Sequence, residues 1–179
     1  MNQPKPRLLE CDYTGLRKVI SGGQDGVDRG ALAAAKAWPL STGGWAPLGY
    51  RTASGDDPTL KEYGLLEHGS PYYPPRTKLN VRDSDGTLLI YTVGTSAGTV
   101  LTRNLCLTFK KPCYEMDLSG EWDEGLVTRC ADWVVRHEIE TLNVAGNHKN
   151  PNYHFTVTHD IVIRLLTELD LAGMVQELV

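Results

Sequence analysis

The stretch that decides the fold is Ser21-Gly22-Gly23-Gln24-Asp25-Gly26-Val27-Asp28-Arg29. It follows a short apolar run, Leu16 to Ile20, and opens an alanine-rich segment that is helical in pattern up to Trp38. A strand, a glycine turn and a helix start are therefore predicted in this order. Such a turn lets the backbone approach a ligand closely, and the free N–H groups of the helix start point at that ligand. We expect a binding site just beyond this first strand.

A second turn of similar build is Gly94-Thr95-Ser96-Ala97-Gly98-Thr99. It follows the clearest predicted strand, 85–92, and precedes a predicted helix at 99–109. Its hydroxyls and free N–H groups suit phosphate oxygens. Ordinary capping of the helix by Ser96 or Thr99 explains this turn equally well on its own. Two glycine turns at two strand ends together favour one anion-binding crevice.

The remaining apolar patterns alternate between strands and helices. Apolar stripes predict a helix through residues 122–133 and a C-terminal helix through residues 161–169, and further strands are predicted at 41–46, 113–118 and 141–145. This alternation indicates an α/β fold, with a mostly parallel sheet and helices on both faces. Ligands of such sheets bind beyond the carboxyl ends of the strands, where the winding direction switches.

The segment 47–81 is too long and irregular for an ordinary connection in an α/β domain. It contains five prolines, and only residues 59–68 have a helical pattern. Loops of this length are usually functional or disordered, and its aromatic and arginine content favours a packed lid. The sequence thus predicts an N-terminal tail at 1–16 and a single domain at 17–179 with a lid-like insertion at 47–81.

Composition limits the classes of function. The chain has 179 residues and a formal charge of −4, without the basic surplus that nucleic-acid binders usually show. No apolar stretch approaches the roughly 20 residues that span a bilayer, and the N-terminus has no signal-peptide core. We therefore expect a cytoplasmic protein that binds neither nucleic acid nor membrane. The four cysteines form no C-x-x-C pair and are expected to be buried and reduced. The five histidines lack the spacing of metal ligands and are expected at the surface or at helix caps. No metal site is therefore predicted.

Individual side chains allow two interpretations each. Arg76 could hold an anion in a bidentate manner, or it could be an exposed arginine. Tyr72 and Tyr73 could stack on a ring, or they could pack the loop. Asp25 or Asp28 could cap the first helix. No Ser/His/Asp arrangement or nucleophile elbow is visible, so no catalytic residue is assigned.

Five blocks of the sequence resemble the molybdenum carrier family. They are the first glycine turn, the segment 47–51 with Tyr63-x-Leu65-x-Glu67, Arg76-Thr77-x-x-Asn80 up to Thr87, Gly98-Thr99-x-x-Thr102, and Leu142-Asn143-Val144-Ala145-Gly146. The resemblance runs from about residue 17 to 146. Each block is weak alone, but the combination is specific.

The resemblance implies a Rossmann-like fold from the superfamily that contains the LOG proteins, DprA and YpsA. Its members bind nucleotides or nucleotide-like ligands in a crevice lined by the glycine turns, and carriers of the molybdenum cofactor hold a pterin phosphate there. Homo-oligomers, dimers or tetramers, are usual in this group. The positions implied to bind ligand are Gly22, Gly23, Gln24, Asp25, Gly26, Asp28, Arg29, Arg76, Thr77, Asn80, Gly94, Thr95, Ser96, Gly98, Thr99, Thr102 and Gly146.

Three departures from the family pattern bear on function. Asp25 replaces the usual threonine, and Asn147-His148-Lys149-Asn150 replaces a segment with proline, arginine and serine. In phosphoribohydrolase relatives a glutamate stands at the position of Thr102. N-glycosidic cleavage by the same route would need the carboxylate of that glutamate. The sequence therefore favours a non-catalytic carrier of a phosphorylated pterin, such as molybdopterin, or of a nucleotide-like ligand. A nucleotide-processing enzyme and a sensor or sequestering protein for a signalling nucleotide are the alternatives.

Overall fold

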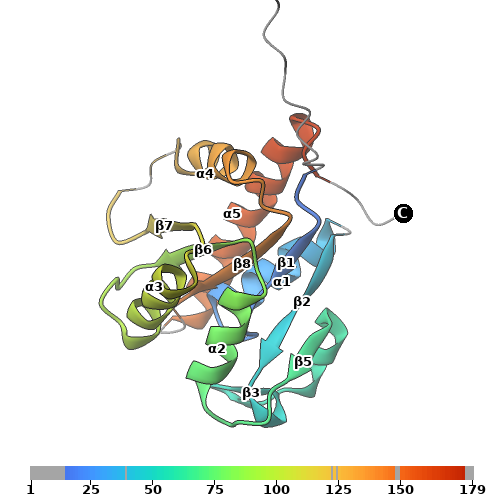
Figure 1. Ribbon diagram of the computed structural model, residues 1–179, viewed down its shortest axis with the longest axis vertical. Helices are drawn as coiled ribbons and strands as arrows, with labels where there is room; N and C mark the ends of the chain where they lie inside the picture. The colour runs from blue at the N-terminus through green and yellow to red at the C-terminus, as the bar shows by residue number, and fades with distance from the viewer. Residues whose placement is uncertain (1–14, 39, 122, 124, 148–149, 176–179) are drawn as a thin grey trace, which may run out of the picture.

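A six-stranded parallel sheet forms the centre of the molecule (Figure 1). The computed structural model describes residues 15–38, 40–121, 123, 125–147 and 150–175. The strands are arranged in the order β5-β2-β1-β8-β6-β7. Their bounds are β1 Lys18–Ile20, β2 Ser41–Ala46, β5 Leu65–Glu67, β6 Gly86–Tyr91, β7 Cys113–Asp117 and β8 Thr141–Gly146. The α/β, Rossmann-like fold predicted from the sequence is thus confirmed.

Helices cover both faces of the sheet. α1 (Val27–Ala37) and α4 (Gly125–Arg136) both pack against the long α5 (Pro151–Leu171) on one face. On the other face α2 (Tyr73–Arg82) packs against α3 (Ala97–Phe109), in front of the sheet in Figure 1.

The alternation of side chains along the strands divides the core between the two faces. In β6, Leu88 and Ile90 belong to the main apolar core beside α1, α4 and α5. Leu89 lies between them in sequence and therefore faces α2 and α3. All three side chains are fully buried, as expected for a parallel strand covered on both sides.

α1 and α5 approach each other very closely at Gly30. A Cβ atom placed on Gly30 would lie only 2.5 Å from the carbonyl oxygen of Phe155. Only a residue without a side chain allows this packing distance. The position of α1, which begins at the first glycine turn, is fixed by this contact.

The winding direction of the sheet reverses next to β1. From β1 the chain winds outward through β2 to β5, whereas β6 and β7 lie on the other side. β8 returns to fill the space between β1 and β6. The carboxyl ends of β1, β8 and β6 therefore meet at the switch point, where α/β sheets bind their ligands.

The segment 47–81 contains more regular structure than the sequence indicated. The predicted helix at 59–68 is wrong beyond its first half: Pro58–Tyr63 forms a 3₁₀ helix, η2, and Leu65–Glu67 is the edge strand β5. A 3₁₀ turn (η1, Leu48–Tyr50) and a small hairpin (β3 Arg51–Thr52, β4 Gly55–Asp56) precede it. The segment ends in α2, which the sequence did not predict, since only residues 59–68 were given a helical pattern there. Pro74 and Pro75 occupy the first turn of the helix, where a missing N–H has no cost.

The boundary predicted for the N-terminal tail also shifts. Residues 1–14 lie outside the described part of the chain, as does Trp122 of the predicted fourth helix. Leu16, however, is fully buried, donates its N–H to the carbonyl oxygen of Met174 (2.9 Å) and pairs with Val175. The domain therefore begins before residue 17. No helix in the described ranges has the length and apolar character to cross a membrane.

Candidate functional site

A cavity of about 330 Å³ lies at the switch point, under α2 and α3. It is lined by seven of the side chains and glycines that the sequence singled out: Gln24, Asp28, Arg76, Thr77, Gly98, Thr102 and Gly146. Of the other lining residues, the sequence offered Tyr73 as a residue that stacks on a ring or packs the loop. The sequence did not predict the remaining five, which are Pro74, Leu89, Ala97, Leu101 and Ala145. These are mainly apolar, so a few polar groups converge in an otherwise apolar cavity, as is typical of small-ligand sites.

Arg76 is the cation of this cavity. α2 carries its side chain inward, where it is only 7% exposed, and its guanidinium lies against the first glycine turn. A Cβ on Gly22 would lie 1.6 Å from Nη1 of Arg76, so glycine is required for this contact. Burial lowers the pKa of Arg76, while Asp28 and Tyr73 oppose that shift. An arginine nevertheless keeps its charge in proteins, so the cavity holds a buried positive charge.

The charge of Arg76 is only partly compensated. Its Nη1 lies 3.6 Å from Oδ2 of Asp28, which is an ion pair but too long for a hydrogen bond. Its Nε is buried and makes no hydrogen bond to any described residue. A buried guanidinium with an unused donor is costly unless another acceptor reaches it.

The first glycine turn already holds a carboxylate. Oδ2 of Asp28 accepts a hydrogen bond of 3.2 Å from the backbone N–H of Gln24. Gly23 and Gly26 have positive φ angles of 73° and 87°, which produce this tight turn. Asp28 thus supplies a negative charge at the turn where the sequence predicted a ligand anion.

Three side chains of the first turn contact the β3–β4 region. Nε2 of Gln24 donates to the carbonyl oxygen of Arg51 (3.0 Å), and the carboxylate of Asp25 accepts from Oγ (2.8 Å) and N–H (3.1 Å) of Ser54. Arg29 forms an ion pair with Asp57. Asp25 and Arg29 therefore hold the segment 51–57 against the first turn and do not line the cavity.

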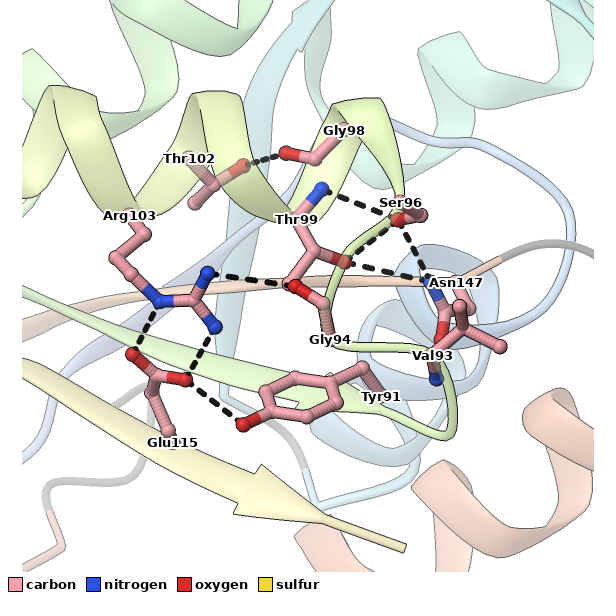
Figure 2. A network of polar contacts seen from close by, with 10 residues as sticks. All are labelled: Tyr91, Val93, Gly94, Ser96, Gly98, Thr99, Thr102, Arg103, Glu115 and Asn147. Atoms are coloured by element: carbon pink, nitrogen blue, oxygen red, sulfur yellow. Dashed lines mark hydrogen bonds and ion pairs between the residues drawn. The ribbon is translucent and has the colours of Figure 1, made fainter. Parts of the chain in front are cut away.

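The second glycine turn forms the start of α3 (Figure 2). Oγ of Ser96 accepts from the N–H of Thr99 (3.3 Å) and lies 2.8 Å from its hydroxyl, so the predicted helix cap is confirmed. Ala97 and Gly98 occupy the first two helical positions, whose N–H groups have no acceptor within a helix. Both residues line the cavity, and a Cβ on Gly98 would meet no atom within 4 Å. The positive end of α3 is therefore open toward the cavity.

Asn147 connects the end of β8 to the second turn, as Figure 2 shows. Its Oδ1 accepts from the N–H groups of Thr92 (2.8 Å) and Val93 (3.0 Å), and its Nδ2 donates to Oγ of Ser96 (3.1 Å). Sequence reasoning marked residues 147–150 only as a departure from the family pattern. An asparagine shortly after the predicted strand 141–145 was the only signal that the sequence offered. His148 and Lys149 lie outside the described residues.

Arg103 supports the same turn from α3. Its Nε and Nη2 each lie 2.6 Å from the carboxylate of Glu115 on β7, and its Nη1 donates to the carbonyl oxygen of Gly94 (3.3 Å; Figure 2). Glu115 also accepts from the hydroxyl of Tyr91 (2.8 Å). The bond to Arg103 lowers the pKa of Glu115, and burial raises the pKa of Tyr91. These contacts hold Gly94 in place without entering the cavity.

The other predicted residues have local roles. Asn80 donates to and accepts from the backbone of Trp45 (3.1 and 2.8 Å), which ties α2 to β2. Gly146 faces Ile90 so closely that a Cβ would lie 1.9 Å from its carbonyl oxygen. Thr95 is exposed.

The histidines and cysteines differ partly from expectation. His154 is 2% exposed instead of lying at the surface, and its Nε2 lies 3.2 Å from Oγ1 of Thr92. Cys106 and Cys130 are buried, as expected, while Cys113 is partly exposed. Within the described ranges no three His, Cys, Asp or Glu side chains are placed to hold a metal ion.

Comparison with known proteins gives two matches. Residues 19–163 match the model of the circularly permutated YpsA SLOG family. The fold is similar to the 1.45 Å crystal structure of a "Putative molybdenum carrier protein" from Syntrophus aciditrophicus SB, with a TM-score of 0.79 and 37% identity. That similarity covers 86% of this chain and 96% of the other. No curated protein matches the chain.

Proposed function

Because the chain belongs to the circularly permutated YpsA SLOG family, we propose that it binds a small phosphorylated ligand in the cavity between α2 and α3. The observation that carries this proposal is Arg76. Its guanidinium is buried in the cavity wall, and its Nε makes no hydrogen bond among the described residues. An anionic oxygen at this place would supply the acceptor that Nε of Arg76 lacks.

The start of α3 supports the same placement of the anion. Ala97 and Gly98, whose N–H groups belong to the first turn of α3, line the same cavity as Arg76. A phosphate group between them would receive hydrogen bonds from the helix start and from the arginine. Because Asp28 already accepts from the first turn, we place the phosphate at the second turn.

The apolar walls favour a ligand with a flat ring system. Leu89 and Leu101 offer apolar surface, and Tyr73 lines the α2 side, where the guanidinium of Arg76 lies over its ring at 5.8 Å from the centroid. A phosphorylated pterin or a nucleotide-like molecule combines such a ring with a phosphate. The name of the Syntrophus protein favours the pterin of the molybdenum cofactor within this class. We propose a carrier role, with the ligand bound and protected but not converted, and we keep the cytoplasmic location and the homo-oligomer as predictions.

The decisive experiment identifies the ligand directly. The protein is purified from its native host and denatured, and the released small molecules are analysed by mass spectrometry alongside a molybdenum measurement. A pterin phosphate, with or without metal, would support the carrier role. A nucleotide without molybdenum would favour a sensor, or an enzyme if the protein converts that nucleotide. Absence of any phosphorylated molecule in stoichiometric amount would contradict the proposal.

Two variants then locate the ligand. Gly98→Trp fills the cavity, whereas Gly98→Ala adds a methyl group in open space and is its matched control. Arg76→Met alone would leave Asp28 buried without its cation, so we combine it with Asp28→Asn. Loss of a charge-assisted hydrogen bond of about 1.5–3 kcal/mol should reduce ligand affinity roughly 10- to 150-fold. Wild-type ligand content in both folded variants would place the ligand elsewhere.

A further inference from the structure

The cavity contains one positive and one negative side chain. Among the described residues that line it, Arg76 and Asp28 are the only charged ones. Both are buried, with 7% and 4% of their surface exposed, and Nη1 of Arg76 lies 3.6 Å from Oδ2 of Asp28. Their formal charges cancel. The lining side chains therefore offer a ligand a guanidinium donor without a net positive charge.

The other cations near the two glycine turns are compensated outside the cavity. Arg29 forms an ion pair with Asp57, and Arg103 forms one with Glu115 (Figure 2). None of these four residues lines the cavity. The start of α3 adds a positive partial charge of about half an elementary charge. An anion in the cavity thus meets a site with a small positive charge.

The start of α3 also leaves room for a substituent on the anion. Ala97 and Gly98 line the cavity and are exposed to solvent as well. A Cβ on Gly98 would meet no atom within 4 Å. A phosphate bound at these two residues can therefore carry a second ester group, which leaves the cavity over Gly98.

We propose that the bound phosphate group carries a single negative charge, as in a phosphodiester; this inference rests on the proposed function of the cavity. The cost of removing an ion from water rises with the square of its charge, whereas its attraction to Arg76 and to the start of α3 rises only in proportion. Asp28 repels each added negative charge. A phosphomonoester carries nearly two charges at pH 7, because its second pKa is about 6. A phosphodiester has no second proton to lose and keeps one charge.

Pairs of probes that differ by one methyl group test this charge preference. Adenosine 5′-monophosphate and guanosine 5′-monophosphate are each compared with their phosphate methyl esters by titration calorimetry on the full-length protein. At about pH 7.5 only about 3% of a monophosphate carries a single charge, against about 90% at about pH 5. We expect the monophosphate to bind roughly 30-fold more weakly than its ester at about pH 7.5, and nearly as tightly at about pH 5.

The ratio of the two affinities is the quantity to compare between the two pH values. His154, whose Nε2 lies 3.2 Å from Oγ1 of Thr92, is a titratable group behind the second turn. Its protonation would change the binding of both members of a pair and largely cancel in the ratio. Equal or tighter binding of the monophosphate at about pH 7.5 would overturn this inference and leave the proposed function standing. Failure of all four probes to bind would overturn both.

Asp28→Asn tests the source of the preference. The amide keeps an oxygen that can accept from the N–H of Gln24, but the negative charge beside Arg76 is lost. We expect the doubly charged monophosphate to gain more than the ester, so that the ratio at about pH 7.5 falls roughly tenfold. Asp56→Asn is the matched control, because it changes the net charge equally at an exposed position, and it should leave the ratio unchanged. A wild-type ratio in folded Asp28→Asn would overturn the charge argument.

Discussion

The close approach of α1 and α5 at Gly30 allows a prediction whose sign the structure decides. In an exposed helix, replacing glycine by alanine stabilises the protein by up to about 1 kcal/mol, because alanine is the better helix former. At Gly30 the new Cβ would lie 2.5 Å from the carbonyl oxygen of Phe155 and 3.1 Å from Cβ of Thr158. Neither atom is the end of a flexible side chain, so the two helices must separate. Overpacking of this kind costs about 1–3 kcal/mol, which outweighs the gain in helix propensity.

We therefore expect Gly30→Ala to lower the free energy of unfolding by about 1–2 kcal/mol and the melting temperature by roughly 2–8 °C. Urea denaturation with an unchanged m-value measures the first quantity and calorimetry measures the second. Gly98→Ala is the control, because its Cβ meets no atom within 4 Å, and its stability should equal or slightly exceed that of the wild type. A Gly30→Ala protein as stable as the wild type would refute the close packing of α1 on α5.

Three further predictions concern the polar contacts around the site. Asn147→Ala removes the acceptor for two N–H groups of the second turn and should lower the free energy of unfolding by about 1–3 kcal/mol in urea denaturation. Asn147→Asp keeps that acceptor and should lower it less. Equal losses of unfolding free energy would show that Oδ1 is not the important atom. Ser96→Ala removes the cap of α3 and should cost about 1 kcal/mol by the same measurement, so an unchanged midpoint would contradict the capping role. The hydrogen bond from Thr59 and the charge of Arg29 lower the pKa of Asp57 below 3.8. The stabilisation by this carboxylate is therefore present above about pH 4 and is lost as the pH falls through the lowered pKa of the folded protein. Asp57→Asn should therefore flatten the loss of stability as the pH falls below about 4, and an identical pH profile would rule out this linkage.

Local pattern predicted the elements that carry long apolar signals. β6 and α3 were recognised because Leu88, Leu89 and Ile90 form a continuous buried run and a capped helix follows. β5 was missed because three residues are too few for periodicity to distinguish a strand from a helix. α2 was missed because its two prolines occur where a helix starts, a position that is visible only once the start is known.

The site was predictable to the extent that the chain itself brings residues together. Both glycine turns lie at strand ends, and this alone placed Asp28 and Gly98 at one edge of the sheet. The partners of Asp25 and Arg29 depend on where the segment 51–57 folds, which no local pattern encodes. Leu89 lines the cavity because the sheet presents alternate residues to opposite faces, and sequence alone does not say which face is hollow.

The pairing of Leu16 with Val175 places the two ends of the described domain beside each other. Because the pairing is parallel, a peptide that joins these ends must reverse direction, so a short flexible linker would be needed and not a single bond. With the ends joined, the chain could be opened at an exposed stretch, such as residues 119–121 after β7, without breaking any pair of the central sheet. The order in which the strands follow one another along the chain is thus separable from their arrangement in the sheet. The cavity depends on the arrangement, and a rearranged chain of this kind should keep it.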